Sequence, residues 1–528
     1  MAKYTKHFQT KQTKQTEPIP GKNQVKNNAG GYTFKITPEA QFKRFLILGS
    51  DGGSYYQTEN DLTVENAENA VEFIKQDGVM AVKLIAEISD QGRAAKNSPA
   101  IFALALVCTF GSPEAKACAY KAIPVVCRIG THIFEFCQYI QDLRGWSRGL
   151  RKGVASYFEK KVADSNLALD VIKYRQRDGW THKDVLRLSH PSISGNDVNS
   201  VLKWAVGKEV TEKNALISAF EQIQKTTNVN EAVKLIEENN LPREAVPTDL
   251  LNSADIWNAL LVKMPMKAMI RNLGKMTSIN LLKSNFGEQE KRVIASLTNV
   301  EALSKARIHP LDILVALKIY SQGHSERGSL SWRPVPGIVE ALNEAFYLSF
   351  KNVAPLGKNF LIGLDVSGSM SSRISDSNSL TSREATSAIS LLLARTEKSA
   401  EVFAFSNSFM PLTVHKNLSL EGLMRKTESL PFQGTDCALP MLHATRNKID
   451  NIDCFIVLTD SETWAGNIHP SQALLDYRRQ FNPEAKLIVL ATVPSAFTIA
   501  DPTDAGYLDI AGFDSSVYSV MQEFLKGW

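Results

Sequence analysis

The spacing of apolar residues changes once along this chain, near Pro355-Leu356-Gly357. Before this point apolar residues recur at helical spacing in one short segment after another, for example over residues 67–88, 113–123, 131–143, 215–223, 229–238 and 310–320. After it, short apolar runs that contain β-branched residues alternate with helical segments. A chain of 528 residues is also too long for one ordinary core. The sequence therefore predicts two structural units that meet at about residue 355.

The first unit, residues 31–355, has the pattern of a helical-repeat array. Short breakers separate its helical segments, among them Gly111-Ser112-Pro113, Gly179 and Pro242. In such an array each helix pair buries its apolar face against its neighbours. No motif recurs at a fixed period, so we expect degenerate repeats. Helical periodicity alone permits an open solenoid as well as a closed ring.

The second unit, residues 356–528, alternates strands with helices. The expected strands cover residues 360–366, 401–405, 454–458 and 486–493, and the expected helices cover residues 383–397, 437–446, 470–480 and 515–526. This alternation predicts an α/β fold with a mostly parallel, doubly wound (Rossmann-like) sheet. In such sheets ligands bind beyond the carboxyl ends of the strands.

Hard oxygen ligands follow two of these strands. Asp365, Ser367 and Ser369 alternate where the first strand ends, and one carboxylate with two hydroxyls suits a small divalent cation such as Mg²⁺. Thr435 lies in a loop before a helix, and Asp460 follows another apolar run. Together these three segments resemble the metal-ion-dependent adhesion site of a von Willebrand factor A domain. The resemblance implies Mg²⁺, or another divalent cation, at these five residues, with a coordination position left for an acidic group.

The same residues permit two other interpretations. In one, the same residues only cap the strands and loops, and the site is empty. In the other, Asp365 is an aspartyl-phosphate nucleophile, but phosphatases of that kind usually carry a second aspartate where Ser367 stands. The chain has no G-x-S-x-G motif around Ser367 and no phosphate-binding loop of the G-x-x-x-x-G-K-[ST] type. We therefore predict a protein that is not an enzyme.

The formal net charge of +5 comes from the N-terminus. Residues 1–28 hold six lysines and one acid, Glu17, so the remainder of the chain is neutral on balance. Repeated Lys-Gln-Thr and few apolar residues predict a flexible basic tail over residues 1–30. Any nucleic-acid surface in the remainder of the chain must then be a local patch of basic residues.

The chain shows no sign of membrane insertion or secretion. Its longest apolar run, residues 100–108, is far shorter than the roughly 20 residues of a membrane span. The N-terminus has no apolar segment of the kind found in signal peptides. The six cysteines show no zinc-binding spacing. We expect a cytoplasmic protein with buried thiols and no membrane partner.

One segment, residues 143–190, is strongly basic. It holds eleven lysines and arginines against five acids, and Trp146, Tyr157, Tyr174 and Trp180 lie between them. Arg148, Arg151 and Lys152 are spaced to share one helix face, where like charges repel unless an anion neutralises them. Single-stranded or irregular RNA suits such a segment, because its phosphates can bind the cations and its unpaired bases can stack on the aromatic side chains. The alternative is a solvated basic face with the aromatics in the core.

The same segment predicts a tight helical corner. Gly179 is expected to end one helix, and residues 181–184 resemble a capping box that opens the next, which stops near residue 190. Lys173 and Arg177 would lie beside this corner, with His190 at the far end of the short helix. His182 lies in the first turn of that helix, which makes it the weaker candidate of the two histidines.

Several long motifs in this chain resemble those of a known family. They are GLRK at residues 149–152, KYRQRDGWTHKDVLRLSH at 173–190, RNLGKMT at 271–277, ARIHP at 306–310, TDCALPM at 435–441 and FTIADP at 497–502. The first four look like the TROVE module. With the second half they make the chain resemble the Ro autoantigen family and its bacterial relatives over roughly residues 30–528.

This resemblance implies a ring of HEAT-like repeats closed by the A domain. Its central hole would admit single-stranded 3′ ends of misfolded RNA, and its outer surface would bind a small Y-like noncoding RNA. Lys173, Arg177 and His190 would belong to the outer surface, while Arg148, Arg151 and Lys152 are RNA-binding candidates for either place. The bacterial relatives imply an exoribonuclease partner tethered through the RNA.

We therefore expect the monomeric scaffold of a small ribonucleoprotein, acting in RNA quality control, processing or decay, with no DNA partner. The rival hypothesis is a Mg²⁺-dependent protein-binding adaptor whose contact with RNA is incidental.

Overall fold

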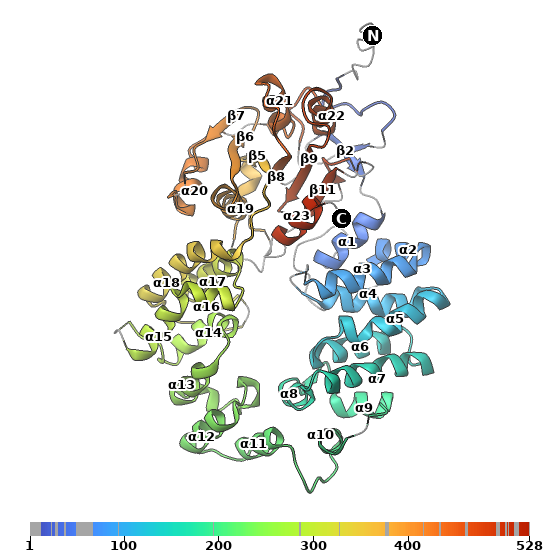
Figure 1. The fold of residues 1–528 in the computed structure, drawn as a ribbon, viewed down its shortest axis with the longest axis vertical. Coiled ribbons are helices and arrows are strands. Elements are labelled where there is room, and N and C mark those ends of the chain that lie inside the picture. The colour runs from blue at the N-terminus through green and yellow to red at the C-terminus, as the bar shows by residue number, and fades with distance from the viewer. Residues whose placement is uncertain are drawn as a thin grey trace.

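The protein is a ring of helices closed by an α/β domain, as the computed structural model shows (Figure 1). The structure describes residues 12–22, 24–26, 30–35, 38–48, 67–92, 94, 96–193, 195–284, 287–326, 328–374, 380–415, 417–431, 434–459, 463–492, 497–501, 504, 506–511 and 517–526. The predicted order, an all-α array followed by a doubly wound α/β domain, is confirmed, and the array is a closed ring. Among the described residues no helix has the length and apolarity to cross a membrane.

The ring consists of short helices joined by tight turns. The helices are α1 (Pro38–Leu48), α2 (Glu68–Gln76), α3 (Gly78–Asp90), α4 (Ser98–Phe110), α5 (Pro113–Val126), α6 (Gly130–Leu143), α7 (Arg148–Ala163), α8 (Leu167–Lys173), α9 (His182–Ser189), α10 (Asn196–Ala205), α11 (Ala215–Ile223), α12 (Val229–Asn239), α13 (Ala254–Lys263), α14 (Met266–Ser278), α15 (Glu288–Leu297), α16 (Val300–Lys305), α17 (Pro310–Gln322) and α18 (Pro336–Leu348). The 3₁₀ turns η3 (Arg243–Ala245), η4 (Leu250–Asn252) and η5 (Ser349–Asn352) connect some of them.

In the N-terminal half of the ring, here called the first arm, helices that are two apart along the chain pack against each other. Helix α3 contacts α5, α5 contacts α7, and α4 contacts α6. This is the contact pattern of stacked helix pairs, in which each pair covers the apolar face of the next. The predicted continuous segment at residues 67–88 is interrupted at Asp77, whose carboxylate accepts the Met80 N–H and starts α3 as a new helix.

The α/β domain, here called the A domain, has one six-stranded sheet. Its strands are β5 (Asn359–Asp365), β6 (Ser399–Phe405), β7 (Phe409–Leu412), β8 (Cys454–Thr459), β9 (Lys486–Ala491) and β11 (Tyr507–Ala511), in the order β11-β9-β8-β5-β6-β7. All neighbours are parallel except β7, which runs antiparallel to β6. The helices are α19 (Ser382–Thr396), α20 (Leu420–Glu428), α21 (Leu439–Arg446), α22 (Pro470–Gln480) and α23 (Val517–Lys526), with the 3₁₀ turn η6 (Gly368–Ser371). The architecture changes between Asn352 and Asn359, on either side of residue 355.

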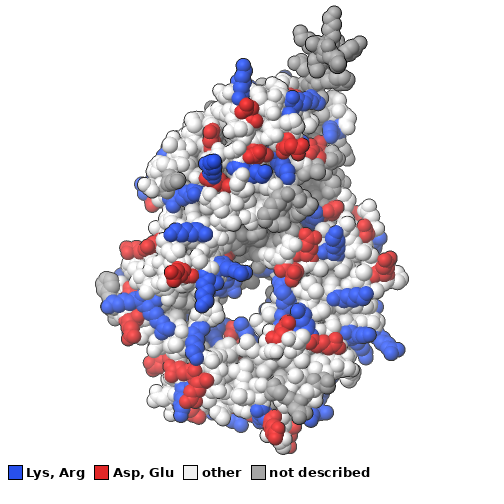
Figure 2. Space-filling model, in the orientation of Figure 1, with Lys and Arg blue, Asp and Glu red and all other residues white. Residues whose placement is uncertain are grey.

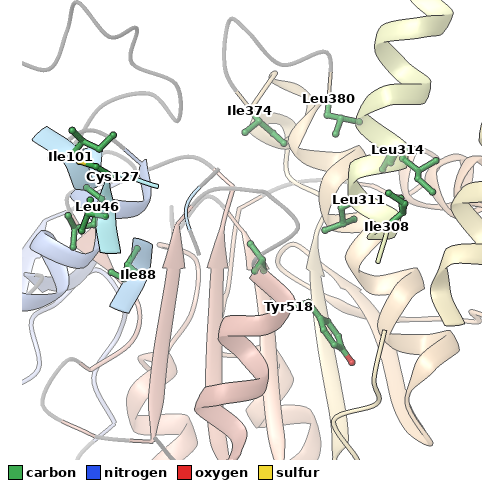
Figure 3. Packing of buried hydrophobic residues seen from close by; sticks show 14 of the residues in the cluster. Leu46, Ile88, Ile101, Cys127, Ile308, Leu311, Leu314, Ile374, Leu380 and Tyr518 are labelled. Atoms are coloured by element: carbon green, nitrogen blue, oxygen red, sulfur yellow. The ribbon is translucent and has the colours of Figure 1, made fainter. Parts of the chain in front are cut away.

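The two faces of this sheet belong to different hydrophobic clusters. Leu361 of β5 joins a cluster with residues of α21 and α22. Its neighbours Phe360 and Ile362 point to the other face and join a cluster that includes α19, α23 and the whole helical ring. Figure 3 shows members of this larger cluster from both arms of the ring and from the A domain. One continuous core therefore holds the ring to the domain that closes it.

At the C-terminal arm, polar contacts join the ring to the A domain. The Tyr518 hydroxyl lies 2.9 Å from both the Ala354 carbonyl oxygen and the Glu397 carboxylate, and either can accept its hydrogen bond. Lys318 of α17 pairs with Glu384 of α19, and the Arg395 guanidinium lies 4.6 Å from the centre of the Tyr347 ring. The chain also passes from the ring into the A domain here, so the two units are joined at this arm by the backbone as well as by side-chain contacts.

At the N-terminal arm, a strap formed by the described parts of residues 12–35 lies on the A domain (Figure 1). Its strands β1 (Gln24–Lys26) and β2 (Tyr32–Lys35) pair with each other, and β2 pairs with β10 (Phe497–Thr498) of the A domain. Lys22 forms an ion pair of 2.7 Å with Asp501. This arrangement differs from the flexible tail that we expected over residues 1–30, of which residues 1–11 lie outside the described residues.

Gln15 explains why the strap is ordered despite its polar composition. Its side chain is fully buried, and its amide nitrogen donates to the Asp436 carboxylate at 2.7 Å and to the Ile468 carbonyl at 3.0 Å. Its amide oxygen accepts from the Thr463 hydroxyl at 2.5 Å. Gly31 allows the strap backbone to approach the backbone of Thr463 closely, because a Cβ at position 31 would lie 2.0 Å from the Thr463 carbonyl oxygen. Specific hydrogen bonds, which composition does not reveal, thus replace apolar burial.

A buried charged group locks α6, α7 and α8 together. The Asp170 carboxylate in α8 lies 3.2 Å from the Lys161 ammonium of α7, and both side chains are nearly inaccessible to water. Asp170 also accepts from the Tyr157 hydroxyl and from the Gly130 N–H that begins α6. This group fixes how the helices of the basic segment are placed.

Replacing Gln15 with leucine should lower the thermal unfolding midpoint of the protein. The change removes one hydrogen bond from the buried Asp436 carboxylate, and such a loss costs about 1–3 kcal/mol. Differential scanning calorimetry measures the effect. Gln12→Leu is the matched control, because Gln12 is an exposed glutamine of the same strap. Equal midpoints for the two variants would show that the strap is not held by Gln15.

Replacing Asp170 with asparagine should destabilise the first arm by about 3 kcal/mol, because the Lys161 charge is left buried without its partner. The exposed pair of Lys160 and Asp164, 3.4 Å apart at the C-terminal end of α7, provides the control Asp164→Asn. That change should shift stability by less than about 1 kcal/mol. Urea denaturation followed by tryptophan fluorescence compares both variants, and equal losses would contradict a locking role for Asp170.

Candidate nucleic-acid interface and metal centre

The basic residues at the start of α7 point away from the ring core. Arg148, Arg151 and Lys152 are exposed, whereas Leu150 and Val154 on the opposite face are buried. Ser147 caps the helix by accepting the Leu150 N–H. The predicted helical spacing of the three cations is therefore confirmed, and they form a compact exposed cluster of positive charge.

These cations line a concavity of about 500 Å³ together with Trp146, Glu159 and His190. His190 comes from the end of α9, which packs against α7. We call this site the outer concavity. It brings together Arg148, Arg151, Lys152 and His190, four of the candidates named from sequence.

His190 and His182 have different environments. The predicted capping box of Thr181 and Asp184 begins α9, and His190 ends it in the left-handed region with φ of 47°, so that its exposed ring reaches the concavity. His182 is buried between the Phe134 and Phe158 rings. Burial lowers its pKa to about 4, so it is neutral at physiological pH and belongs to the core.

Lys173 and Arg177 do not flank a helical corner, and Gly179 does not end a helix. Helix α8 ends at Lys173, and the chain then forms a hairpin of β3 (Gln176–Arg177) and β4 (Trp180–Thr181). Asp178 and Gly179 are its two turn residues, with φ of 51° and 80°. Asp-Gly is a favoured pair for a two-residue hairpin turn, because both positions need positive φ. Our prediction gave weight to helix-ending glycine and overlooked this pair.

Lys173 at the end of α8 and Arg177 in the hairpin both lie outside the lining of the outer concavity. The Arg177 Nε atom lies 3.4 Å from the Asp178 carboxylate, and the Lys173 ammonium lies 5.4 Å from the centre of the Tyr174 ring. Trp180 of the hairpin packs against Trp146 of the concavity, with ring centres 5.9 Å apart. The two tryptophans join the hairpin and the concavity into one outer surface.

A second basic site lies inside the ring, which has an open centre bordered by lysine and arginine side chains (Figure 2). A cavity of about 780 Å³, here called the inner cavity, is lined by α14 and α17 of one arm and by Gly92 and Ala94 of the other. Lys267, Arg271 and Lys275 line it from one face of α14, along with Arg243.

The inner cations are not among the RNA-binding residues predicted from the sequence. Residues 271–277 are part of a family motif, although the four-residue spacing of Lys267, Arg271 and Lys275 also predicts a basic helix face. Their charges are only partly balanced within the cavity. Lys267 lies 3.5 Å from the Asp312 carboxylate, and Lys275 donates to the Asn252 amide oxygen at 3.0 Å.

The candidate metal residues meet at the carboxyl edge of the sheet. Asp365 is fully buried, and its carboxylate accepts the Ser367 N–H at 2.8 Å and the Thr459 hydroxyl at 2.7 Å. The Ser367 and Ser369 hydroxyls lie 3.0 Å apart. Asp460 lies outside the described residues.

Thr435 is buried in the neighbouring loop, and a 2.8 Å hydrogen bond from the Asp436 N–H to the Ser406 carbonyl ties this loop to the residue that follows β6. Burial and the nearby Asp365 charge raise the pKa of the Cys437 thiol, which keeps that thiol protonated. The hydroxyls and the carboxylate are thus hard oxygen donors that suit Mg²⁺ better than a soft metal.

Comparison with known families identifies both halves of the chain. The TROVE domain matches residues 25–241 and 233–319, and the Ro60 vWA domain matches residues 359–525. The two matches follow the division between the helical ring and the A domain seen in the structure.

Two relatives are similar over nearly their full length. Both are named RNA-binding protein RO60. The protein from Deinococcus radiodurans is 38% identical over 519 residues, which is 97% of each chain. The protein from Caenorhabditis elegans is 36% identical over 589 residues, covering 96% of this chain and 90% of its own.

The crystal structure of the Ro (Rsr) protein of Deinococcus radiodurans is similar in fold, with a TM-score of 0.78 and 37% identity. The similarity covers 93% of this chain and all of that one. Matching domains in both halves, near-complete coverage and a shared fold show that this chain belongs to the Ro60 family, with a TROVE ring closed by a Ro60 vWA domain.

Proposed function

We propose that this protein is the RNA-binding scaffold of a small ribonucleoprotein that serves RNA quality control, processing or decay. The observation that carries the proposal is the presence of two separate cationic sites on one ring, one outside and one inside. Its relatives in a bacterium and a nematode are named RNA-binding proteins, which supports the same function. The scaffold has no catalysis of its own.

The outer concavity suits structured RNA. Arg148, Arg151 and Lys152 supply donors for phosphates, and an anion would relieve the repulsion between these neighbouring like charges. Trp146 supplies an aromatic face for an unpaired base. Because the surface is open to solvent, a folded RNA can approach it without threading. We assign it to a Y-like noncoding RNA, with Lys173, Arg177 and His190 at the same surface.

The inner site suits a single strand. RNA must enter the ring to reach Lys267, Arg271 and Lys275, and a free single-stranded 3′ end of a misfolded RNA passes a narrow opening more easily than a duplex does. The cations there would contact the RNA backbone, so their binding would not depend on the RNA sequence. The proposed arrangement keeps the structured part of an RNA outside the ring while its end is inside.

The A domain supplies a candidate docking site for a further partner. Asp365, Ser367, Ser369 and Thr435, with Asp460 from the third loop, would hold Mg²⁺, and the ion would present an open coordination position to an acidic group. We propose that the protein acts in the cytoplasm as a monomer, and that an exoribonuclease reaches it through the bound Y-like RNA.

Removing the outer cations should weaken the binding of structured RNA. The triple variant Arg148→Ala, Arg151→Ala and Lys152→Ala loses phosphate contacts, each of which contributes about 0.7–0.9 to the slope of log affinity against log salt. We expect the slope to fall by about 2 and the affinity at moderate salt to fall at least about tenfold. Fluorescence anisotropy over a salt series measures both quantities.

Lys160→Ala is the control for this triple variant, since Lys160 is exposed at the other end of α7 and outside the concavity. A single-stranded oligonucleotide should bind the triple variant as it binds the original protein. Unchanged affinity of the variant for structured RNA would contradict the outer site and would favour the protein-binding adaptor.

Magnesium should stabilise the A domain through the oxygen cluster. A ligand that binds only the folded state at 100 times its Kd adds about 2.7 kcal/mol, so the thermal midpoint should rise from EDTA to excess Mg²⁺. Ser369→Ala should abolish the rise, and Ser372→Ala, an exposed serine just beyond η6, should preserve it. A midpoint that does not respond to Mg²⁺ in the original protein would refute a metal site.

A further inference from the structure

The inner cavity contains more than phosphate-binding cations, because one of its walls is apolar and aromatic. Ile270 of α14, Val315, Ala316 and Ile319 of α17, and Trp332 line it, and all five are only partly buried. Partly exposed apolar side chains beside arginine and lysine are a poor surface for water and a good one for a nucleobase. A base has an apolar face, and its phosphate carries a negative charge.

We propose that the inner cavity is a subsite that holds one unstacked base of an RNA strand in the ring while the cations of α14 hold the flanking phosphates. This inference rests on the proposed function and names the part of the RNA that the inner site recognises. A cavity of about 780 Å³ is within the usual range of about 300–1,000 Å³ for small-molecule sites, so a nucleotide fits it.

Trp332 is held rigidly, as a stacking platform requires. Its indole N–H donates to the Tyr320 carbonyl at 2.9 Å, and its ring is nearly parallel to the Tyr320 ring, with centres 6.0 Å apart. Its backbone N–H donates to the Gly323 carbonyl at 2.8 Å. Trp332 is only partly buried and lines the cavity, so little side-chain entropy would be lost when a base packs against the part of the indole that borders the cavity.

Gly274 of α14 fixes the position of that ring relative to the cations. A Cβ on Gly274 would lie 2.7 Å from the indole, so glycine allows α14 to contact Trp332 directly. Arg271 and Lys275 are the neighbours of Gly274 on the same helix, and both line the cavity. The backbone contact thus places positive charge next to the aromatic wall, which is the combination that a base with its phosphate requires.

The cavity also lies where a strand in the ring would pass. Gly92 and Ala94, from the loop between α3 and α4, line it from the opposite arm, so it is part of the ring interior and not of the outer surface. Stacking is sequence-tolerant, because every base has an aromatic face. The subsite would therefore hold RNA ends of any sequence, as a quality-control scaffold needs.

A walk of single abasic residues along a short single-stranded RNA tests this inference. Stacking of one base contributes about 1–3 kcal/mol, so one position, and not its neighbours, should show a loss of affinity of about 5- to 150-fold. In Trp332→Leu the intact RNA should bind as weakly as the abasic RNA binds the original protein, and the abasic residue should cause no further loss. Trp332→Phe should restore most of the difference in affinity between intact and abasic RNA.

Two further variants distinguish the loss of the base subsite from an effect on folding. Ala316→Leu fills the apolar wall without removing the platform, and it should also remove the position-specific loss. Arg271→Ala should weaken intact and abasic RNA by the same factor, because it removes a phosphate contact. A flat abasic profile in the original protein would overturn the base subsite while leaving RNA binding intact. Failure of every single-stranded RNA to bind would instead overturn the proposed function.

Discussion

A helical-repeat array has two ends, and the apolar face of each terminal helix must be covered. In this protein a single A domain covers both ends. One hydrophobic cluster includes Phe42 of α1, Leu311 of α17 and Ile362 of β5, so the ring and the domain share a core. The other features of the molecule depend on this shared core. An array held at both ends encloses an opening, and an array held at one end does not.

Closure gives the helices an inside and an outside with different chemistry. Arg148, Arg151 and Lys152 lie on an exposed concavity, while Lys267, Arg271 and Lys275 line the interior. Both sets follow helical spacing, so their local structures are alike. Their accessibility differs, because one set meets a folded molecule at the surface and the other meets only what enters the ring. This difference is the physical basis for assigning two kinds of RNA to one scaffold.

Local patterns predicted much of the molecule. The change near residue 355, the capping box at Thr181 and Asp184, and the strand that ends at Asp365 depend on short-range periodicity and hydrogen bonding, and the structure has all three. The family resemblance predicted the ring. The hairpin at Asp178 and Gly179 was also a local signal, and it was overlooked because Gly179 was taken as the end of a helix. The order of the strap was not predictable locally, since Gln15 is stabilised by groups more than 400 positions away.

By itself the sequence determined which residues carry charge, which helix face they occupy, and that oxygen donors follow the strand ending at Asp365. These properties depend on neighbours within a few residues of one another. Only the tertiary structure decided that His190 joins the α7 cations, that the α14 cations face an enclosed space beside Trp332, and that a basic N-terminal segment docks on the A domain. The first relation is set by the packing of α9 on α7, and the other two by closure of the ring with the A domain, which brings together positions that no local pattern connects.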